Sequence, residues 1–272
     1  DALIFDLRDN GGGGPSVIQM VYGYLLDGPT LVTGFYTRET DTHQQFWSPP
    51  YVPGPGLVDV PVFVLVGPRT FSAAEAFAFS MQTLERGAIV GEKTGGGSHP
   101  VRPIPVPGTD MIVHVPFAQT VDPRSDSDWE GTGVVPDLEV PVEEALAAAH
   151  LEALAAIAEQ VSDPSRRRAL EMIRDRRKAL MDAPVLEEEV MAEYPGQYSG
   201  DVEVEIGWEE GGLVMKIRGV RFSNLTFMGE DRFALDRSLG QLPFTRGEGG
   251  RVSGFEAVVG DEGSKVVRRV GN

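Results

Sequence analysis

Apolar residues form two kinds of pattern in the first half of the chain. Near-continuous apolar runs at Asp1–Leu7, Val60–Val66 and Ala88–Gly91 are typical of strands that are buried on both faces. Apolar residues spaced three or four apart predict helices over Ser16–Leu26 and Ser72–Arg86. Because strands alternate with helices, the pattern indicates an α/β domain.

The first of these runs begins at residue 1, which is Asp rather than Met. A strand buried on both faces has neighbours on both sides. We therefore expect strands that precede it in the natural protein to be missing here, together with any signal peptide. We also expect a long loop over residues 41–57, a glycine-rich loop over 92–100 and a strand over Met111–Phe117.

Two helices are expected next, over Glu143–Gln160 and from Asp163-Pro164 to about Met181. Asp as the cap and Pro in the first turn are typical of a helix start. The second helix is rich in Arg and Lys, interleaved with acidic residues. It is either a basic docking helix or a solvated linker, and the acidity of the whole chain favours the linker.

From about residue 190 the pattern changes to short stretches in which apolar and charged residues alternate. Expected strands cover 202–206, 213–217, 221–227, 232–235, 252–259 and 265–270. Short strands with Gly-rich turns are typical of a small antiparallel β-barrel or sandwich. The sequence thus predicts an α/β domain over 1–142, a helical connector over 143–187 and an all-β domain over 188–272.

The composition limits the classes of partner that this protein is expected to bind. The chain of 272 residues has 24 Lys and Arg against 41 Asp and Glu, a net charge of −17. Such a charge argues against binding nucleic acid, which requires a positive field, and against docking on anionic membranes. No apolar run is long enough for membrane insertion. The oligomeric state is left open.

The chain has no Cys and four His, and none of the His has a paired metal-ligand spacing. Disulfides, thiolate zinc sites and cysteine nucleophiles are excluded, and we expect neither a metal nor a cofactor.

Ser72 is the main candidate for a nucleophile. It follows a buried strand and a turn and stands at a helix start, where unpaired backbone N–H groups favour an anion. These conditions suit a nucleophilic serine beside an oxyanion site. In the alternative, Ser72-Ala73-Ala74-Glu75 is only a capping box. The Gly-x-Ser-x-Gly elbow of α/β-hydrolases is absent.

The loop Asn10–Gly14 could offer backbone N–H groups to an oxyanion, or it could simply be a tight turn. It lacks the residues that would follow in a phosphate-binding loop.

Three motifs, taken together, resemble one family. They are Leu3-Ile4-Phe5-Asp6-Leu7-Arg8-Asp9-Asn10-Gly11-Gly12-Gly13, the segment Ser72-Ala73-Ala74-Glu75 with Arg86–Thr94, and Trp129–Asp137. In this order they resemble the C-terminal-processing (tail-specific) serine peptidases, over about residues 1–150. The resemblance implies a crotonase-like fold for this part of the chain.

The residue at position 97 indicates which branch of that family the chain resembles. The position of the catalytic lysine in the Ser–Lys branch falls on Gly97, and nearby Lys93 does not match the motif. The loop around His99 and the Trp129-Glu130-Gly131 ending resemble the other branch. That branch contains tricorn-type proteases and the repeats of interphotoreceptor retinoid-binding protein.

The resemblance implies Ser72 as the nucleophile, Glu130 as a helper carboxylate, and Gly12 or Gly13 with Ala73 as the oxyanion hole. His99 either acts near the site or fixes its loop, and we favour the structural role. The family's base comes from an upstream segment, so we expect poor hydrolysis by this chain alone.

The stretch Tyr194–Gly200 resembles the small β-barrel that is appended to secreted serine hydrolases of bacteria. The sequence therefore predicts a periplasmic or extracellular serine peptidase that acts on peptides or proteins through an acyl-enzyme. The alternative is a non-catalytic module that binds an apolar ligand on the same fold. An acyl-CoA enzyme is disfavoured because no basic site for nucleotide phosphates is visible.

Overall fold

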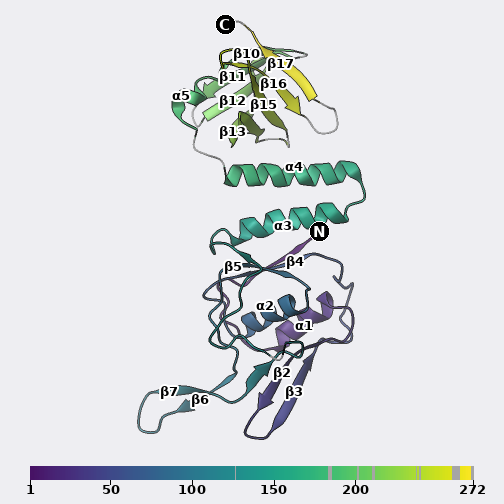
Figure 1. Ribbon diagram of the computed structural model, residues 1–272, viewed down its shortest axis with the longest axis vertical. Coiled ribbons are helices and arrows are strands. Elements are labelled where there is room, and N and C mark those ends of the chain that lie inside the picture. The colour runs from purple at the N-terminus through teal and green to yellow at the C-terminus, as the bar shows by residue number, and fades with distance from the viewer. Residues whose placement is uncertain are drawn as a thin grey trace. The chain divides into compact units, whose positions relative to one another are not determined.

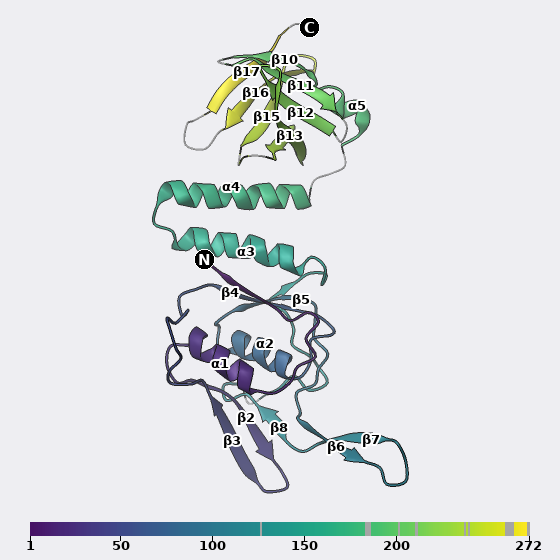
Figure 2. The same cartoon turned by 180° about the vertical axis from the view of Figure 1, so that it is seen from behind.

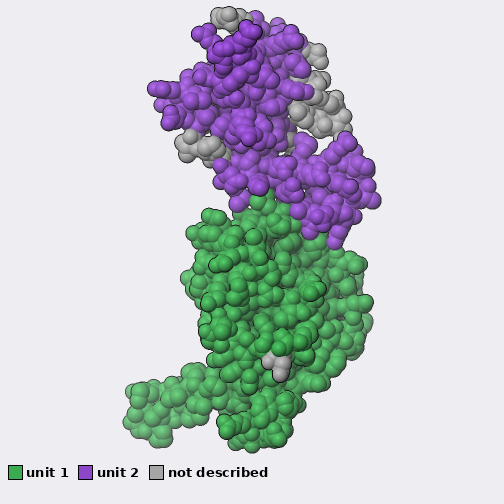
Figure 3. All heavy atoms as spheres, in the orientation of Figure 1, with its two compact units in different colours: residues 1–153 green, residues 154–272 purple. Residues whose placement is uncertain are grey.

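The computed structural model describes residues 1–125, 127–182, 186–200, 202–209, 212–236, 238, 240–258 and 264–270. The chain divides into two compact units, residues 1–153 and 154–272, coloured separately in Figure 3.

A four-stranded parallel sheet forms the centre of the first unit, in the order β1-β4-β5-β9. Its strands are β1 (Leu3–Asp6), β4 (Val62–Val66), β5 (Ala88–Gly91) and β9 (Leu138–Glu139). Every residue of β4 is buried, as its apolar run predicts, whereas β1 lies at an edge of the sheet and is only partly buried.

Helices α1 (Ser16–Leu25) and α2 (Ala73–Thr83) lie side by side next to this sheet (Figures 1 and 2). The Tyr22 and Phe77 rings stack at 5.6 Å between the two helices, and Phe5 of β1 meets Phe77 edge-on at 5.1 Å. The core of the unit is therefore assembled from the predicted strands and helices.

Two further groups of strands belong to this unit. The antiparallel sheet β3-β2-β8 is made of β2 (Leu31–Thr37), β3 (Thr42–Trp47) and β8 (Gln119–Val121). The expectation of a loop throughout 41–57 was wrong at β3. The sequence of β3 is mostly polar and shows no strand pattern. The strand is stabilised by its pairing with β2, in which Tyr36 lies opposite His43.

The hairpin β6–β7 (Val101–Pro105 and Ile112–Pro116) pairs with itself and projects from its unit (Figures 1 and 3). All ten of its strand residues are exposed. The sequence predicts the second strand but not the first, which carries Pro103 and Pro105.

Three helices follow β9. They are α3 (Ala145–Gln160), α4 (Pro164–Met181) and α5 (Glu188–Met191). Asp163 caps α4 as predicted, because its side chain accepts the Ser165 N–H at 2.9 Å. None of the α4 residues is buried, which agrees with a solvated helix. Within the described residues, no helix combines the length and the apolar character that crossing a membrane requires.

The second unit contains a closed antiparallel barrel of eight strands, β10 to β17. The strands are β10 (Gly196–Ser199), β11 (Val204–Glu209), β12 (Gly212–Ile217), β13 (Val220–Gly229), β14 (Arg232–Leu235), β15 (Gln241–Arg246), β16 (Val252–Val258) and β17 (Ser264–Arg269). The barrel form of the prediction is confirmed, while β10 and β15 were not expected. Closure pairs β10 with β17, so it leaves no free sheet edge.

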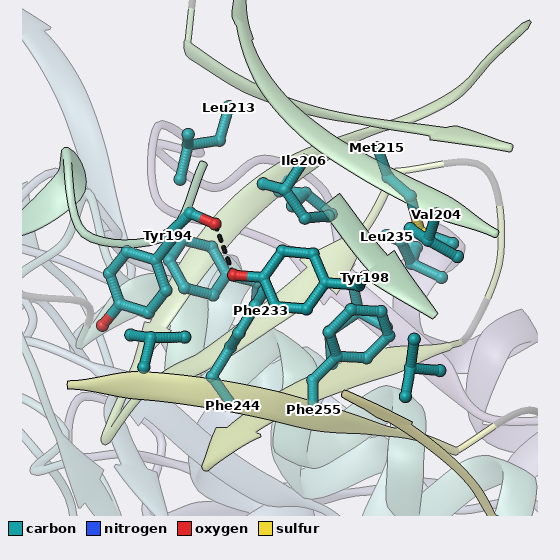
Figure 4. Packing of buried hydrophobic residues seen from close by; sticks show 14 residues of the cluster. Tyr194, Tyr198, Val204, Ile206, Leu213, Met215, Phe233, Leu235, Phe244 and Phe255 are labelled. Atoms are coloured by element: carbon teal, nitrogen blue, oxygen red, sulfur yellow. Dashed lines mark hydrogen bonds between the residues drawn. The ribbon is translucent and has the colours of Figure 1, made fainter. Parts of the chain in front are cut away.

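Inward-facing side chains fill the barrel (Figure 4). Phe233, Phe244 and Phe255 contact one another or the rings of Tyr194 and Tyr198, with centroids 4.8–5.9 Å apart. The hydroxyl of Tyr198 donates to the Tyr194 carbonyl at 2.6 Å, the dashed line in Figure 4. The barrel is therefore a packed core.

Candidate active site

The candidate site lies where β1 and β4 end. These strands are parallel neighbours, so the segments after them leave the same edge of the sheet, where α/β folds commonly bind ligands. Thr70 is fully buried and donates through Oγ1 to the Leu7 carbonyl at 2.7 Å. The Phe71 N–H donates to the Asn10 carbonyl at 3.0 Å. These two hydrogen bonds hold the loop Asn10–Gly14 next to the turn that precedes Ser72.

Ser72 is exposed and is the N-cap of α2. Its backbone has φ 54° and ψ −121°, a conformation that is costly for a residue with a Cβ. Helix α2 thus begins with a strained serine, which a simple capping role does not require.

Gly12 packs directly against this serine. A Cβ placed on Gly12 would lie 2.8 Å from the Ser72 Cβ, 2.8 Å from the Ala73 nitrogen and 2.6 Å from the Phe71 carbonyl oxygen. Only glycine permits this approach, at a φ of 95°. The structure therefore brings Gly12, Ser72 and Ala73 together.

The hydrogen bonds distinguish the two glycines proposed for the oxyanion hole. The Gly12 N–H donates to the Asn10 side chain at 2.9 Å, so it is already engaged. Gly13 lines the same cavities as Ala73. The Ala73 N–H belongs to the first turn of α2, whose amides have no partner within the helix.

Glu75 stabilises the site through hydrogen bonds from its buried carboxylate. The sequence indicated this residue only as part of a capping box. It is fully buried. Its Oε2 accepts the Ser72 N–H at 2.7 Å, as the capping box predicts, and also the Gly97 N–H at 2.9 Å. Its Oε1 accepts the Gly96 N–H at 2.7 Å and the Thr94 hydroxyl at 2.5 Å. One carboxylate therefore holds α2 and the 92–100 loop together.

The 92–100 loop is also joined to the Trp129–Asp137 motif. The Thr94 N–H donates to the Val134 carbonyl at 3.2 Å, and the Gly131 N–H donates to the Gly96 carbonyl at 2.9 Å. A Cβ on Gly133 would lie 2.3 Å from the Thr94 carbonyl oxygen. The three motifs that lie far apart in sequence thus meet around the start of α2.

Glu130 lies next to His99, and its carboxylate accepts hydrogen bonds from backbone N–H groups. Its Oε2 accepts the Ser98 N–H at 2.7 Å and the His99 N–H at 2.9 Å. The His99 Nε2 lies 3.1 Å from Asp128 Oδ2, and its Nδ1 lies 3.9 Å from Glu130 Oε2. Both ring nitrogens therefore face carboxylates, which agrees with a structural role for His99.

Asp128 was not identified from the sequence, where nothing separates it from other acidic residues. Burial would raise the pKa of its carboxyl. The Glu130 N–H and the His99 ring together outweigh burial and hold that pKa below its usual value. Asp128 thus anchors His99 as a carboxylate.

Gly97 faces an aromatic ring. A Cβ at this position would lie 2.1 Å from Cζ of Phe71. The Phe71 ring therefore occupies the space into which any side chain at position 97 would project. Lys93, the lysine next to this loop, is exposed.

Two cavities flank Gly13 and Ala73. One, of about 350 Å³, extends between the glycine loop, β1 and α1. The other, of about 270 Å³, has Ser72, Ser98 and Trp129 in its wall and is otherwise mainly apolar. Among the described residues, no group of His, Asp and Glu is arranged to hold a metal ion.

Comparison with known proteins identifies the class. The model of peptidase family S41 matches residues 1–140, more than half of the chain, and the chain belongs to this family. A tail-specific protease of Haemophilus influenzae is 36% identical over 103 residues, which are 35% of this chain and 13% of that protein. The chain therefore spans only a small part of that relative.

The solved structures that match part of this chain include the photosystem II D1 C-terminal processing protease. It has 25% identity and a TM-score of 0.44, and the match covers 52% of this chain and 35% of that one. The tricorn protease has 20% identity and a TM-score of 0.32, over 65% of this chain and 15% of that one.

Proposed function

We propose that this chain carries the nucleophile of a serine-type peptidase and that Ser72 is that nucleophile. The observation that carries the proposal is the strained backbone of Ser72, at a φ of 54°. Strain of this kind in a residue other than glycine collects at functional sites. A sharp turn at a helix start also presents a serine hydroxyl to substrate in other hydrolases.

In the proposed reaction, the Ser72 oxygen attacks the peptide carbonyl carbon while a general base takes the hydroxyl proton. The C–N bond then breaks, the amine leaves with a proton, and water hydrolyses the acyl-enzyme. The N–H groups of Gly13 and Ala73 would stabilise the oxyanion. Gly12 would let the loop approach closely.

The general base is not His99 in this proposal, because the ring of His99 is held between Asp128 and Glu130. Glu130 is proposed as a positioning residue, since its carboxylate holds the amides of Ser98 and His99. The base would come from a segment outside this chain, as in the tricorn-like branch that the sequence resembles.

Peptides or proteins in the periplasm or outside the cell are the proposed substrates. The mainly apolar cavity beside Ser72 also supports the second candidate, a non-catalytic module that holds an apolar ligand. The two candidates differ in whether Ser72 reacts.

Labelling with a fluorophosphonate probe tests the reactivity of Ser72 in this chain and in the natural full-length protein. We expect labelling of the full-length protein to disappear in Ser72→Ala. Ser16→Ala is the matched control, because Ser16 is also exposed at a helix start after a glycine loop. Labelling that persists in Ser72→Ala would overturn the proposal. A full-length protein that is never labelled would favour the binding module.

A further inference from the structure

The projecting hairpin β6–β7 has two outer edges, and its hydrogen bonds show which backbone groups lie on them. At one end of the ladder, the Val106 N–H donates to the Met111 carbonyl at 3.0 Å. Hydrogen-bonded pairs alternate with non-bonded pairs along an antiparallel ladder. Because the register also pairs Ile104 with Val113, the backbone groups of these two residues face each other. The backbone groups of every second residue, starting with Ile112 on β7, therefore point away from the hairpin.

The two outer edges differ in what they offer to another strand. On β6 the outward positions include Pro103 and Pro105, which have no N–H group, and proline in an edge strand blocks further pairing. On β7, Ile112 and His114 each direct an N–H and a C=O outward. None of these groups has a protein partner among the residues that the structure describes. The β7 edge is therefore open, whereas the β6 edge is closed.

The side chains of the hairpin are mostly apolar and exposed. Ile104, Val113 and Val115 lie on one face of it, because paired residues and alternate residues of a strand share a face. They are 48%, 49% and 39% exposed. The segment 101–116 has one basic and one acidic residue, so its charge is balanced in a chain with a net charge of −17. The hairpin is thus a surface on which two copies of this acidic chain can meet without strong repulsion.

We propose that the open β7 edge pairs with the same edge of a second copy of this chain, so that the two hairpins form one antiparallel sheet. The outward groups of Ile112 and His114 lie symmetrically about Val113. A two-fold axis at Val113 therefore brings Ile112 of each copy opposite His114 of the other. Each such pair exchanges two N–H···O=C bonds, and the apolar faces of the two hairpins become continuous.

The balanced charge of the hairpin favours a second copy over another surface of the same chain, because two chains of net charge −17 repel each other elsewhere. An exposed apolar strand with a free edge is also a ready template for pairing. The interface contains neither Ser72 nor Glu130, so it stands or fails independently of the proposed function.

Small-angle X-ray scattering over a concentration series tests the pairing, because it measures the mean mass. We expect a monomer–dimer equilibrium for the parent chain. His114→Pro removes an outward N–H from β7 and no bond between β6 and β7. It should raise the dissociation constant at least about tenfold, since each dimer loses two hydrogen bonds. Val101→Pro, which removes an outward N–H from the β6 edge, is the matched control and should leave the constant unchanged.

Charge substitutions at Val113 test the two-fold register. Val113→Glu and Val113→Lys each place like charges directly opposite each other across the axis, which destabilises strand pairing. We expect each variant alone to be monomeric and an equimolar mixture of the two to dimerise. Val113 is half exposed, so the hairpin itself should tolerate both charges, and the unfolding midpoint of each variant is compared with that of the parent.

Three results would overturn the proposal. One is a parent chain that stays monomeric up to about 1 mM, where even weak pairing is populated. Another is a dimer that His114→Pro leaves intact, or a mixture of the two Val113 variants that does not pair. The natural full-length protein is measured in the same way, and if it is monomeric, something other than a second copy covers the β7 edge.

Discussion

At the scale of single residues, the site depends on two features. Glycines allow the loops around Ser72 to pack closely, and one carboxylate accepts several hydrogen bonds from these loops. Gly12, Gly97 and Gly133 each stand where a Cβ would meet another residue at less than 3.0 Å. Glu75 joins the start of α2 to the 92–100 loop by four hydrogen bonds. These contacts lead to three predictions.

Gly12→Ala should disrupt the site, because its Cβ would meet the Phe71 carbonyl, Ser72 and Ala73. We expect a loss of about 1–3 kcal/mol in the free energy of unfolding from backbone strain alone, with loss of probe labelling at Ser72. Gly14→Ala is the matched control, since its Cβ would meet nothing within 4 Å. Equal effects of both substitutions would contradict the prediction.

Gly97→Ala should destabilise the protein modestly, because the Phe71 ring that occupies the space of the new Cβ is 45% exposed and can turn toward solvent. In a double-mutant cycle, Phe71→Ala should relieve most of that cost, with a coupling of about 0.5–3 kcal/mol. Denaturant unfolding of the parent, both single variants and the double variant measures the coupling. Additive costs would show that the ring is not the obstacle.

Glu75→Gln should be strongly destabilising. Each carboxylate oxygen accepts two donors, so either orientation of the glutamine amide turns its NH₂ toward one pair. We expect a loss of about 1–3 kcal/mol for each donor left unpaired. Glu152→Gln, at an exposed position of α3, should change the stability by less than about 0.5 kcal/mol. Denaturant titration of both variants makes the comparison.

At the scale of elements, the barrel depends on aromatic residues that enter it from β10, β14, β15 and β16, and from Tyr194 just before β10. Two of them carry hydroxyls. Burial raises the pKa of Tyr198 to about 12, against the influence of Arg269. Burial and Asp231 raise the pKa of Tyr194 to about 12.

Because burial favours the neutral tyrosine, these groups stabilise the barrel fully below pH 10, the ordinary value, and less as the pH rises to about 12. Tyr198→Phe should lower the stability at neutral pH, since a hydrogen bond is lost, but flatten its alkaline decline. Denaturant unfolding followed by circular dichroism across this pH range measures both effects. Tyr51→Phe, at an exposed position of the other unit, should leave the decline unchanged.

At the scale of the whole molecule, two hydrophobic cores are built from separate parts of the chain. One contains Val64, Phe77 and Met81, and the other contains Tyr198, Phe233 and Phe255. No strand pairing joins the two units within the described residues. The predicted boundaries at 142 and 188 remain a prediction.

Calorimetry should therefore show two unfolding transitions. Phe233→Ala should lower only the transition of the barrel, and Met81→Ala only that of the unit formed by residues 1–153, since large-to-small core changes cost about 2–5 kcal/mol locally. A single transition that both substitutions shift alike would mean that the units unfold together.

Local pattern was sufficient for the elements with strong periodicity. Sequence alone predicts the strand β4 from its apolar run, the helix α2 from its apolar spacing and the start of α4 from the Asp163 cap. In each case the signal comes from residues that are neighbours in the sequence. The same holds for the alternation in the barrel strands. The motifs around Gly12, Ser72 and Glu130 were sufficient to indicate the family.

Tertiary structure decided what depends on distant partners. Strand β3 is polar and exists through its pairing with β2, and the barrel closes through β10 and β17. Glu75 and Gly96 lie 21 positions apart in the sequence, and His99 and Asp128 lie 29 positions apart. The cavity wall likewise combines residues from Gly13 to Trp129. No local pattern encodes such contacts, because their energy appears only when the fold brings the partners together.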